Sequence, residues 1–403
     1  MMIKSILSQH IIGLTGQVSA ALPMLLITIV LARWVSVEQA GYFSIYIGSS
    51  AVVFSLGLWG LRPQIVLDRY VAFGKSSYSF FRYGAILFSC LVAFMSADDS
   101  KLDVILIWIV IFYRSIDSVV DLNMAFDQVS LPNSKAIRNF SLQHVVKLSL
   151  VLISLLVGYL FGFVIMYISL FICGVIMLLF NVSRQMFSQA PFTSIKVSKS
   201  FDTAAGIFKA GFWFALASLS CAVITNLPRI SVASFYEEEA LGVVGVTLSV
   251  TAFFGMVYNM TWVRALPKFS LIQNRNRVIT LFIVENSLVT LILLIGAYFL
   301  LPNIVAFIFD FNGRQNLEIS RNVMLCSVIF FCGQIFSNLY KVTSKPWLEV
   351  CSYSLALLVA LCWWLVGADS LVLILISSGL SMIMFSLIGF YLMERRYESG
   401  VIL

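Results

Sequence analysis

Three ionisable side chains interrupt one long apolar stretch of the sequence, and they are the residues whose types and spacing are best placed to act on a ligand. The stretch 103–126 reads DVILIWIVIFYRSIDSVVDLNMAF and contains Arg114, Asp117 and Asp121. In a helix, positions i, i+3 and i+7 share one face. Two interpretations stay open: the residues form a polar stripe that lines a lumen, or Arg114 and Asp117 form a local ion pair that specifies helix packing.

Further ionisable residues lie in other apolar stretches. His144 and Lys147 are one turn apart near the start of 140–161, and Lys147 either faces a lumen or extends to the cytoplasmic surface. Glu285 has no basic residue within two turns of its own helix. It is therefore either a site that takes up a proton or the partner of a base on another helix. The candidates for ion coupling or ion pairing are Asp117, Asp121, Glu285 and His144.

Two more positions affect the shape of a predicted helix or the lining of a lumen. Pro23 lies midway along 11–33 and removes one backbone hydrogen bond, so we expect a kink that serves as a hinge. Arg229 follows Pro228 near the end of 206–234, where a lumen position and an interfacial position both remain open.

The composition shows which elements must position these side chains. Of 403 residues, 60% are hydrophobic and 11% are charged, against about 25% charged in soluble domains. Apolar runs near 20 residues recur, and each is long enough as a helix to cross ~30 Å of hydrocarbon. We predict an all-α polytopic membrane protein of about twelve helices: 11–33, 41–61, 83–97, 104–125, 140–161, 163–181, 206–234, 240–262, 278–302, 322–343, 348–366 and 370–393.

The basic residues predict the orientation. With the N-terminus inside, 19 of the 26 Lys and Arg residues fall in cytoplasmic segments, and five fall on the opposite side. This bias is the one that the positive-inside rule describes, so we expect both termini in the cytoplasm. The formal net charge of +7 therefore reflects membrane topology and not binding of nucleic acid.

A weak internal repeat predicts two lobes. Glu38 and Gly41 follow the first predicted helix, as Glu239 and Gly242 follow the seventh, with an offset of 201 residues. Because six helices return the chain to the same side, the halves should be related by a parallel pseudo-two-fold axis normal to the membrane. The predicted lobes are 1–181 and 206–403, joined by a Ser/Thr-rich cytoplasmic linker at 182–205.

The sequence contains few of the residues that would indicate an enzyme, and it lacks several common motifs of enzymes and metal sites. There are two histidines, and no P-loop, G-x-S-x-G, H-E-x-x-H or EF-hand pattern. The seven cysteines lie singly in apolar stretches, which predicts neither disulfides nor a metal site. We expect a transporter that needs no cofactor.

Two segments resemble Wzx-type O-antigen flippases of the multidrug/oligosaccharidyl-lipid/polysaccharide exporter superfamily. IVLARWVSVEQAGYFSIYIGSSAVVFSLGLWGLRPQIV (29–66) has the family's Arg and acidic turn, its Gly-aromatic pair at Gly41-Tyr42, and its Gly-Leu-Arg exit at 60–62. LPRISVASFYEEEALGVVGV (227–246) resembles the start of the second half. Family members often carry Asp-Arg where this chain has Pro228-Arg229, so any role of that acid is absent or moved here.

The resemblance implies translocation of undecaprenyl-diphosphate-linked oligosaccharide across the bacterial inner membrane. Alternating access of a partly cationic central cavity would move the polar head while the lipid tail stays in the bilayer. Arginine suits phosphate geometry. The implied partners are the lipid-linked oligosaccharide, membrane lipids, a polysaccharide polymerase and chain-length proteins. The candidates for binding the anionic cargo are Arg62, Arg114, Arg229, Arg264 and Lys147.

Two other functions compete with this one. An ion-coupled multidrug exporter of the same superfamily would use Asp117 and Asp121 for the coupling ion, whereas the arginines at helix ends favour an anionic cargo. A membrane polysaccharide polymerase should have a sizeable periplasmic loop, and the predicted loops are short.

Overall fold

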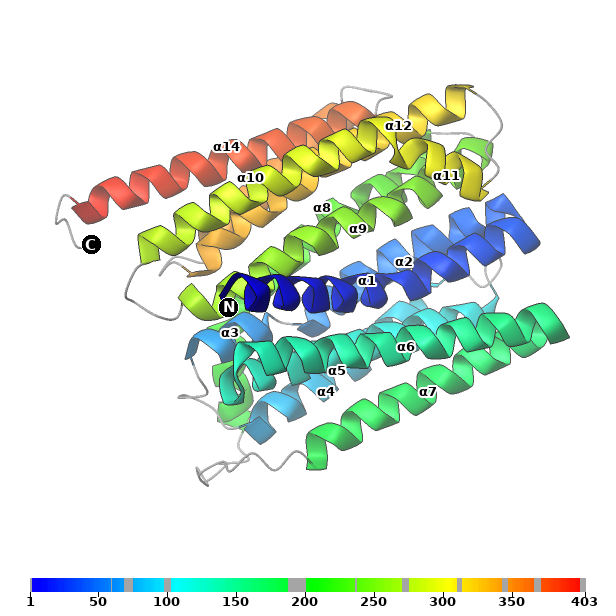
Figure 1. Cartoon of the computed structure of the whole chain (residues 1–403), viewed down its shortest axis with the longest axis horizontal. Helices are drawn as coiled ribbons and strands as arrows, with labels where there is room; N and C mark the ends of the chain where they lie inside the picture. The colour runs from blue at the N-terminus through cyan, green and yellow to red at the C-terminus, as the bar shows by residue number, and fades with distance from the viewer. Residues whose placement is uncertain are drawn as a thin grey trace. The chain divides into compact units, whose positions relative to one another are not determined.

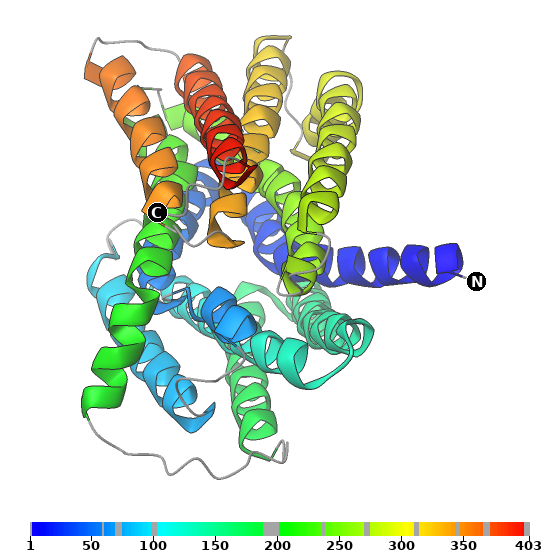
Figure 2. The same ribbon diagram turned by 90° about the vertical axis from the view of Figure 1, so that its left-hand side faces the viewer.

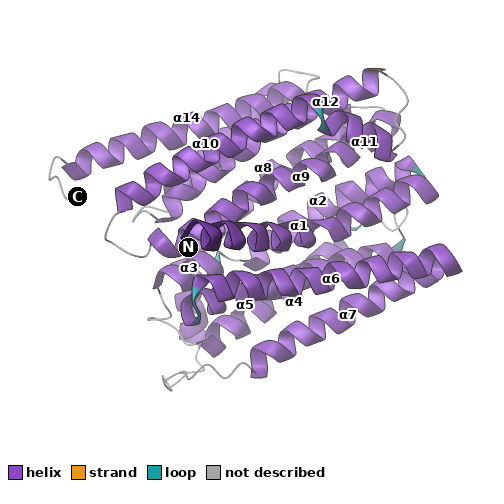
Figure 3. Cartoon of the chain, viewed as in Figure 1, coloured by secondary structure: helices purple, strands orange, loops and turns teal. Residues whose placement is uncertain are grey.

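The computed structural model describes residues 2–58, 60–68, 75–97, 103–187, 201–235, 238–269, 275–309, 314–342, 347–365 and 371–398. The regular elements within these ranges are helices (Figure 3). In the first half they are α1 Met2–Trp34, α2 Val37–Leu58, α3 Leu61–Asp68, α4 Lys75–Met95, α5 Val104–Ser130, α6 Asn133–Phe161 and α7 Phe163–Phe187. In the second half they are α8 Phe201–Phe235, α9 Glu238–Phe269, α10 Arg275–Phe299, α11 Leu301–Phe309, α12 Arg314–Ser337, the 3-10 turn Asn338–Val342, α13 Trp347–Leu365 and α14 Leu371–Glu398.

The helices confirm an all-α polytopic membrane protein. In the described ranges, nine helices are long and apolar enough to cross a membrane. Of the other long helices, α8 and α13 contain the shorter apolar segments Gly211–Asn226 and Trp347–Trp363, and α5 is interrupted by its ionisable residues. Each of the twelve predicted helices coincides with one long helix, and α3 and α11 are additional short ones.

The chain divides into two compact units, Met1–Leu219 and Ser220–Leu403. The division falls inside α8, which begins at Phe201. Helix α7 continues to Phe187, beyond the predicted start of the linker at 182. Residues 188–200 of the predicted linker lie outside the described part of the chain.

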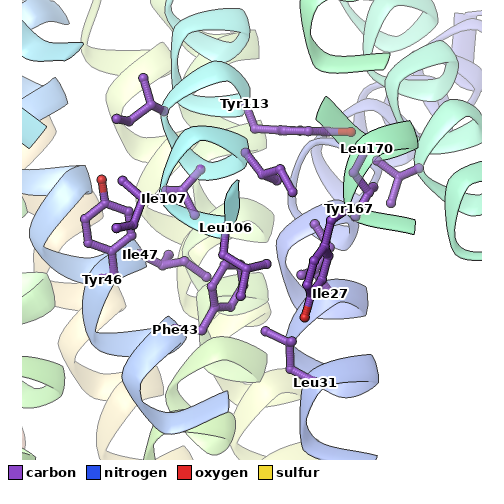
Figure 4. Packing of buried hydrophobic residues seen from close by; sticks show 14 of the residues in the cluster. Ile27, Leu31, Phe43, Tyr46, Ile47, Leu106, Ile107, Tyr113, Tyr167 and Leu170 are labelled. Atoms are coloured by element: carbon purple, nitrogen blue, oxygen red, sulfur yellow. The ribbon is translucent and has the colours of Figure 1, made fainter. Parts of the chain in front are cut away.

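The first unit is built around α5. This helix packs against α2, α3, α4, α6 and α7, and α1 packs against α2 and α6 (Figures 1 and 2). Buried apolar side chains of α1, α2, α4, α6 and α7 meet those of the N-terminal half of α5, and Figure 4 shows part of this cluster. They include Ile27, Leu31, Phe43, Ile47, Leu106, Ile107, Tyr113, Tyr167 and Leu170. One end of the unit therefore has an apolar core, and the ionisable residues of α5 lie further along the helix.

The second unit is built around α12. Helix α12 packs against α9, α10, α13 and α14, as α5 packs against α2, α4, α6 and α7. These helices correspond in chain order, which agrees with the predicted repeat. Two glycines permit the close contact of α12 with α14, because a Cβ on Gly333 would lie 2.6 Å from the carbonyl oxygen of Gly379. Close contact through small residues is a common way for helices to associate in lipid.

Several helix boundaries differ from the prediction. Helix α4 begins at Lys75, eight residues before the predicted start, and α6 begins at Asn133 instead of 140. The first turns of α4 read KSSYSFFR and are too polar to be recognised by hydropathy. As a result Arg82, which the charge pattern places in a cytoplasmic loop, is a fully buried helical residue.

Gly60 makes the break between α2 and α3. Its φ of 57° lies in the left-handed region, which costs an L residue with a Cβ ~1–2 kcal/mol. A Cβ here would also overlap Phe214 of α8. The chain therefore turns at Gly60 and places the short helix α3 against α5.

We expect Gly60→Ala to lower the midpoint of thermal unfolding by several degrees, because it adds left-handed strain and a steric overlap. Gly84→Ala in α4 is the matched control, since a Cβ at Gly84 meets nothing within 4 Å and alanine is the better helix former. Tryptophan fluorescence of the purified protein would report both midpoints. Equal midpoints for the two variants would contradict the role assigned to Gly60.

Candidate functional site

Helix α5 contains the three ionisable residues that the sequence analysis identified. Each of them contacts a residue on another helix. Arg114, Asp117 and Asp121 lie on α5, and their partners come from α2, α3, α4 and α6. A buried charge must be compensated by a partner, since an uncompensated one is very costly in a medium of low dielectric. The contacts of α5 therefore fix the relative positions of its neighbours.

Asp117 pairs with a lysine on α6. Lys147 Nζ contacts Asp117 Oδ1 and also donates a hydrogen bond to the carbonyl oxygen of Ala20 at 3.1 Å. His144, one turn earlier on α6, places Nδ1 3.9 Å from the same carboxylate oxygen. The Lys147 side chain is 2% exposed, so it does not extend to the cytoplasmic surface. Lys147 links α5 and α6 to α1, three residues before Pro23, which is itself buried within that helix.

Asp121 is shared by two arginines. Its Oδ1 lies 3.4 Å from Arg62 Nη1 on α3, and its Oδ2 lies 3.1 Å from Arg82 Nη2 on α4. Arg62 Nε also donates to Gln128 Oε1 at 3.1 Å, and Arg82 Nη1 donates to the carbonyl oxygen of Gly57 at 3.4 Å. One carboxylate thus joins α3, α4 and α5.

Arg114 contacts the backbone of a neighbouring helix. Its Nη2 donates to the carbonyl oxygen of Ile47 on α2 at 3.0 Å. Asp117, which one interpretation of the sequence pairs with Arg114, pairs with Lys147 instead. The local ion pair within α5 is therefore not the arrangement found, and Arg114 is half-buried without a carboxylate of its own.

The C-terminal half of α5 continues this polar contact with α6 and α7. Asn123 Nδ2 donates to Gln143 Oε1 at 3.4 Å, and Asp127 Oδ2 accepts from Asn139 Nδ2 at 3.0 Å. Asp127 also pairs with Arg184 of α7 at 3.3 Å. This neutral pair lies outside the groups around Asp117 and Asp121.

The two groups around Asp117 and Asp121 carry excess positive charge. Arg62, Arg82 and Lys147 contact these two carboxylates, and Arg114, on the same helix as both, adds a fourth cation. The carboxylates are the more accessible members, with Asp117 35% and Asp121 28% exposed. In these two groups the cations are therefore more buried than the carboxylates that they contact.

The other predicted site residues belong to the second unit. Glu285 is half-buried in α10 of the second unit. Helices α8 and α9 contain Arg229 and Arg264, whose side chains lie outside the described part of the structure. Sequence reasoning missed Arg82 and Gln128. Arg82 lies in the aromatic sequence YSFFRY, and this apolar surrounding could have indicated that the arginine belongs to a helix.

Comparisons with known proteins identify the fold. No family model and no curated protein matches the sequence. The structure is similar to the MATE multidrug transporter DinF-BH, with a TM-score of 0.70, 14% identity, and coverage of 97% of this chain and 95% of that chain. It is also similar to an outward-facing multidrug resistance MATE family transporter of the MOP superfamily (TM-score 0.65, 14% identity, 99% and 97% covered).

A third similar structure is a MOP superfamily transporter from Pyrococcus furiosus Vc1 whose binding pocket has reverse polarity. Its TM-score is 0.62, with 12% identity and coverage of 98% of this chain and 96% of that chain. At these identities the likeness concerns the fold. The chain has the fold of MOP superfamily transporters and is a multi-pass membrane protein.

We expect Lys147→Met and Asp117→Asn each to lower thermal stability, because each leaves the other side chain without its partner. The double variant should lose less than the sum, with a coupling of roughly 0.5–3 kcal/mol. Lys135→Met is the control, since Lys135 is exposed in the first turn of α6. Thermal unfolding of the four proteins gives the coupling, and strictly additive losses would rule against the pair.

Proposed function

We propose that this protein is a transporter and not an enzyme, and that it moves undecaprenyl-diphosphate-linked oligosaccharide across the membrane. The cargo would be a repeat unit of O-antigen or capsule, carried from the cytoplasmic to the periplasmic face by alternating access. The MOP transporter fold and the resemblance of segments 29–66 and 227–246 to Wzx-type flippases support this proposal.

The observation that carries the proposal is the surplus of buried and half-buried cations in the first unit. Arg62, Arg82 and Lys147 contact two carboxylates, Asp117 and Asp121, and half-buried Arg114 on α5 adds a fourth cation. A surplus of this kind is retained at a cost in hydrocarbon, so it needs a use. A diphosphate group supplies the missing negative charge, and guanidinium groups match its oxygen atoms in pairs.

The proposal includes a location and partners. We place the protein in the bacterial inner membrane with both termini in the cytoplasm, on the distribution of Lys and Arg. Its partners would be the lipid-linked oligosaccharide, membrane lipids, and the polymerase and chain-length proteins that act on the cargo afterwards. Nucleic acid is not among them.

An ion-coupled multidrug exporter is the second candidate. The similar MATE structures favour it, and so does the accessibility of Asp117 and Asp121, because carboxylates attract cations. Each of these carboxylates already contacts a cation, however, with Lys147 on Asp117 and both Arg62 and Arg82 on Asp121. A cationic drug would have to displace these partners, which makes the anionic cargo the better match.

Deletion of the gene separates the two functions. If the cargo is a lipid-linked oligosaccharide, the deletion strain should accumulate lipid-linked repeat units on the cytoplasmic face and lose long surface polysaccharide. Extraction of lipid-linked sugars and electrophoresis of surface polysaccharide would measure both. Unchanged polysaccharide together with new drug sensitivity would favour the exporter.

Replacement of Arg114 tests its part in cargo binding. Arg114→Ala should cost about 1.5–3 kcal/mol of stability, the range for one hydrogen bond from a charged donor, here the bond to Ile47. Transport should nevertheless stop. Arg114→Lys should restore it in part, because the lysine keeps the positive charge but lacks the bidentate hydrogen-bond donor of arginine. Complementation of the deletion strain, with membrane abundance measured in parallel, gives the result. Normal polysaccharide with Arg114→Ala would remove Arg114 from the site.

A further inference from the structure

Arg62 and Arg82 hold Asp121 in the way that two arginines hold a phosphate group. Each guanidinium uses one nitrogen on a different oxygen of the carboxylate, at 3.4 and 3.1 Å. The two side chains come from α3 and α4, so separate helices converge on one small anion. This arrangement is more than a helix-packing contact needs, since a single arginine would neutralise Asp121.

The arginine pair has more donors than Asp121 can accept. Arg62 Nη2 and Arg82 Nε are buried and have no hydrogen-bond partner. A guanidinium has five N–H donors, whereas a carboxylate has two oxygens. In a lipid-linked diphosphate both phosphates are esterified, so each offers two non-bridging acceptor oxygens and the whole group carries a charge of about −2. The pair is therefore better matched to a diphosphate than to the carboxylate it holds.

The arginines are fixed independently of Asp121. Arg62 Nε is bound to Gln128 Oε1, and Arg82 Nη1 is bound to the carbonyl oxygen of Gly57. Arg82 is 0% and Arg62 11% exposed, while Asp121 is 28% exposed. The carboxylate is thus the accessible member of the group. It can leave while both guanidinium groups stay in place.

We propose that Arg62 and Arg82 form a phosphate subsite for the diphosphate of the cargo, and that Asp121 is an internal anion that occupies this subsite until the cargo displaces it. The inference rests on the proposed function and adds to it a defined phosphate subsite and an exchange step. Asp121 keeps two buried charges compensated while the transporter is empty. When the cargo leaves, the carboxylate returns and competes with rebinding.

The exchange can be measured with inorganic pyrophosphate and the full chain in phosphatidylcholine nanodiscs. Asp121→Asn removes the competing charge at constant size, so pyrophosphate should bind at least about tenfold more tightly than to the unmodified chain. Asp127→Asn is the matched control, because it is the same substitution on the same helix at the Arg184 pair. Titration calorimetry should give this control the affinity of the unmodified chain.

A second variant keeps the test independent of the stability of Asp121→Asn. Arg82→Lys retains the charge opposite Asp121 and loses the two-pronged donor, so pyrophosphate should bind about fivefold or more weakly than to the unmodified chain. Undecaprenyl diphosphate added to the nanodisc should displace pyrophosphate from the unmodified chain. Failure to displace it would assign the subsite to a free anion and overturn the proposal.

The outcomes also separate this inference from the proposed function. Equal affinities of Asp121→Asn and Asp127→Asn would overturn the exchange, even if gene deletion abolishes surface polysaccharide. A tenfold gain that Arg82→Lys reverses when added to Asp121→Asn would establish the subsite, even if gene deletion leaves polysaccharide intact. In that case the diphosphate lipid would be a cargo other than a polysaccharide repeat unit.

Discussion

The first unit depends on the compensation of charge along α5. Asp117 and Asp121 lie within a helix that crosses hydrocarbon, where an unpaired charge is expensive. Their partners come from α3, α4 and α6, and Lys147 also binds the backbone of α1. Arg114 adds a contact to α2. In lipid the hydrophobic effect contributes little to helix association. These few polar contacts therefore favour one arrangement of the helices.

The burial of each charged side chain determines which charges are accessible at the surface of the first unit. The cations Lys147 and Arg82 are almost fully buried, and the carboxylates in front of them are about a third exposed. The accessible charges are therefore negative, although the net charge of the two groups is positive. Movement of one carboxylate would expose the cations behind it, so the polarity of this surface is set by side-chain position as well as by composition.

The sequence predicted the helices better than it predicted the site. Apolar runs and the bias of basic residues are properties of single helices, and all twelve long helices are present. The spacing of Arg114, Asp117 and Asp121 likewise identified α5. Partners on other helices follow from tertiary packing, which periodicity does not encode, so Lys147 was not paired with Asp117 in advance. Arg82 was missed because the polar first turns of α4 resemble a loop.

The second unit serves as an internal comparison for the charges of the first. Helix α12 packs against the helices that correspond to the neighbours of α5, and the polar contacts here include hydrogen bonds of Ser337 with Ser352 and Ser386, and of Thr290 with Cys332. Hydroxyl and thiol groups are much cheaper to bury than charges. In the first unit α5 makes charged contacts instead, through Lys147 with Asp117 and through Arg62 and Arg82 with Asp121, so its polar contacts are the more expensive ones to bury.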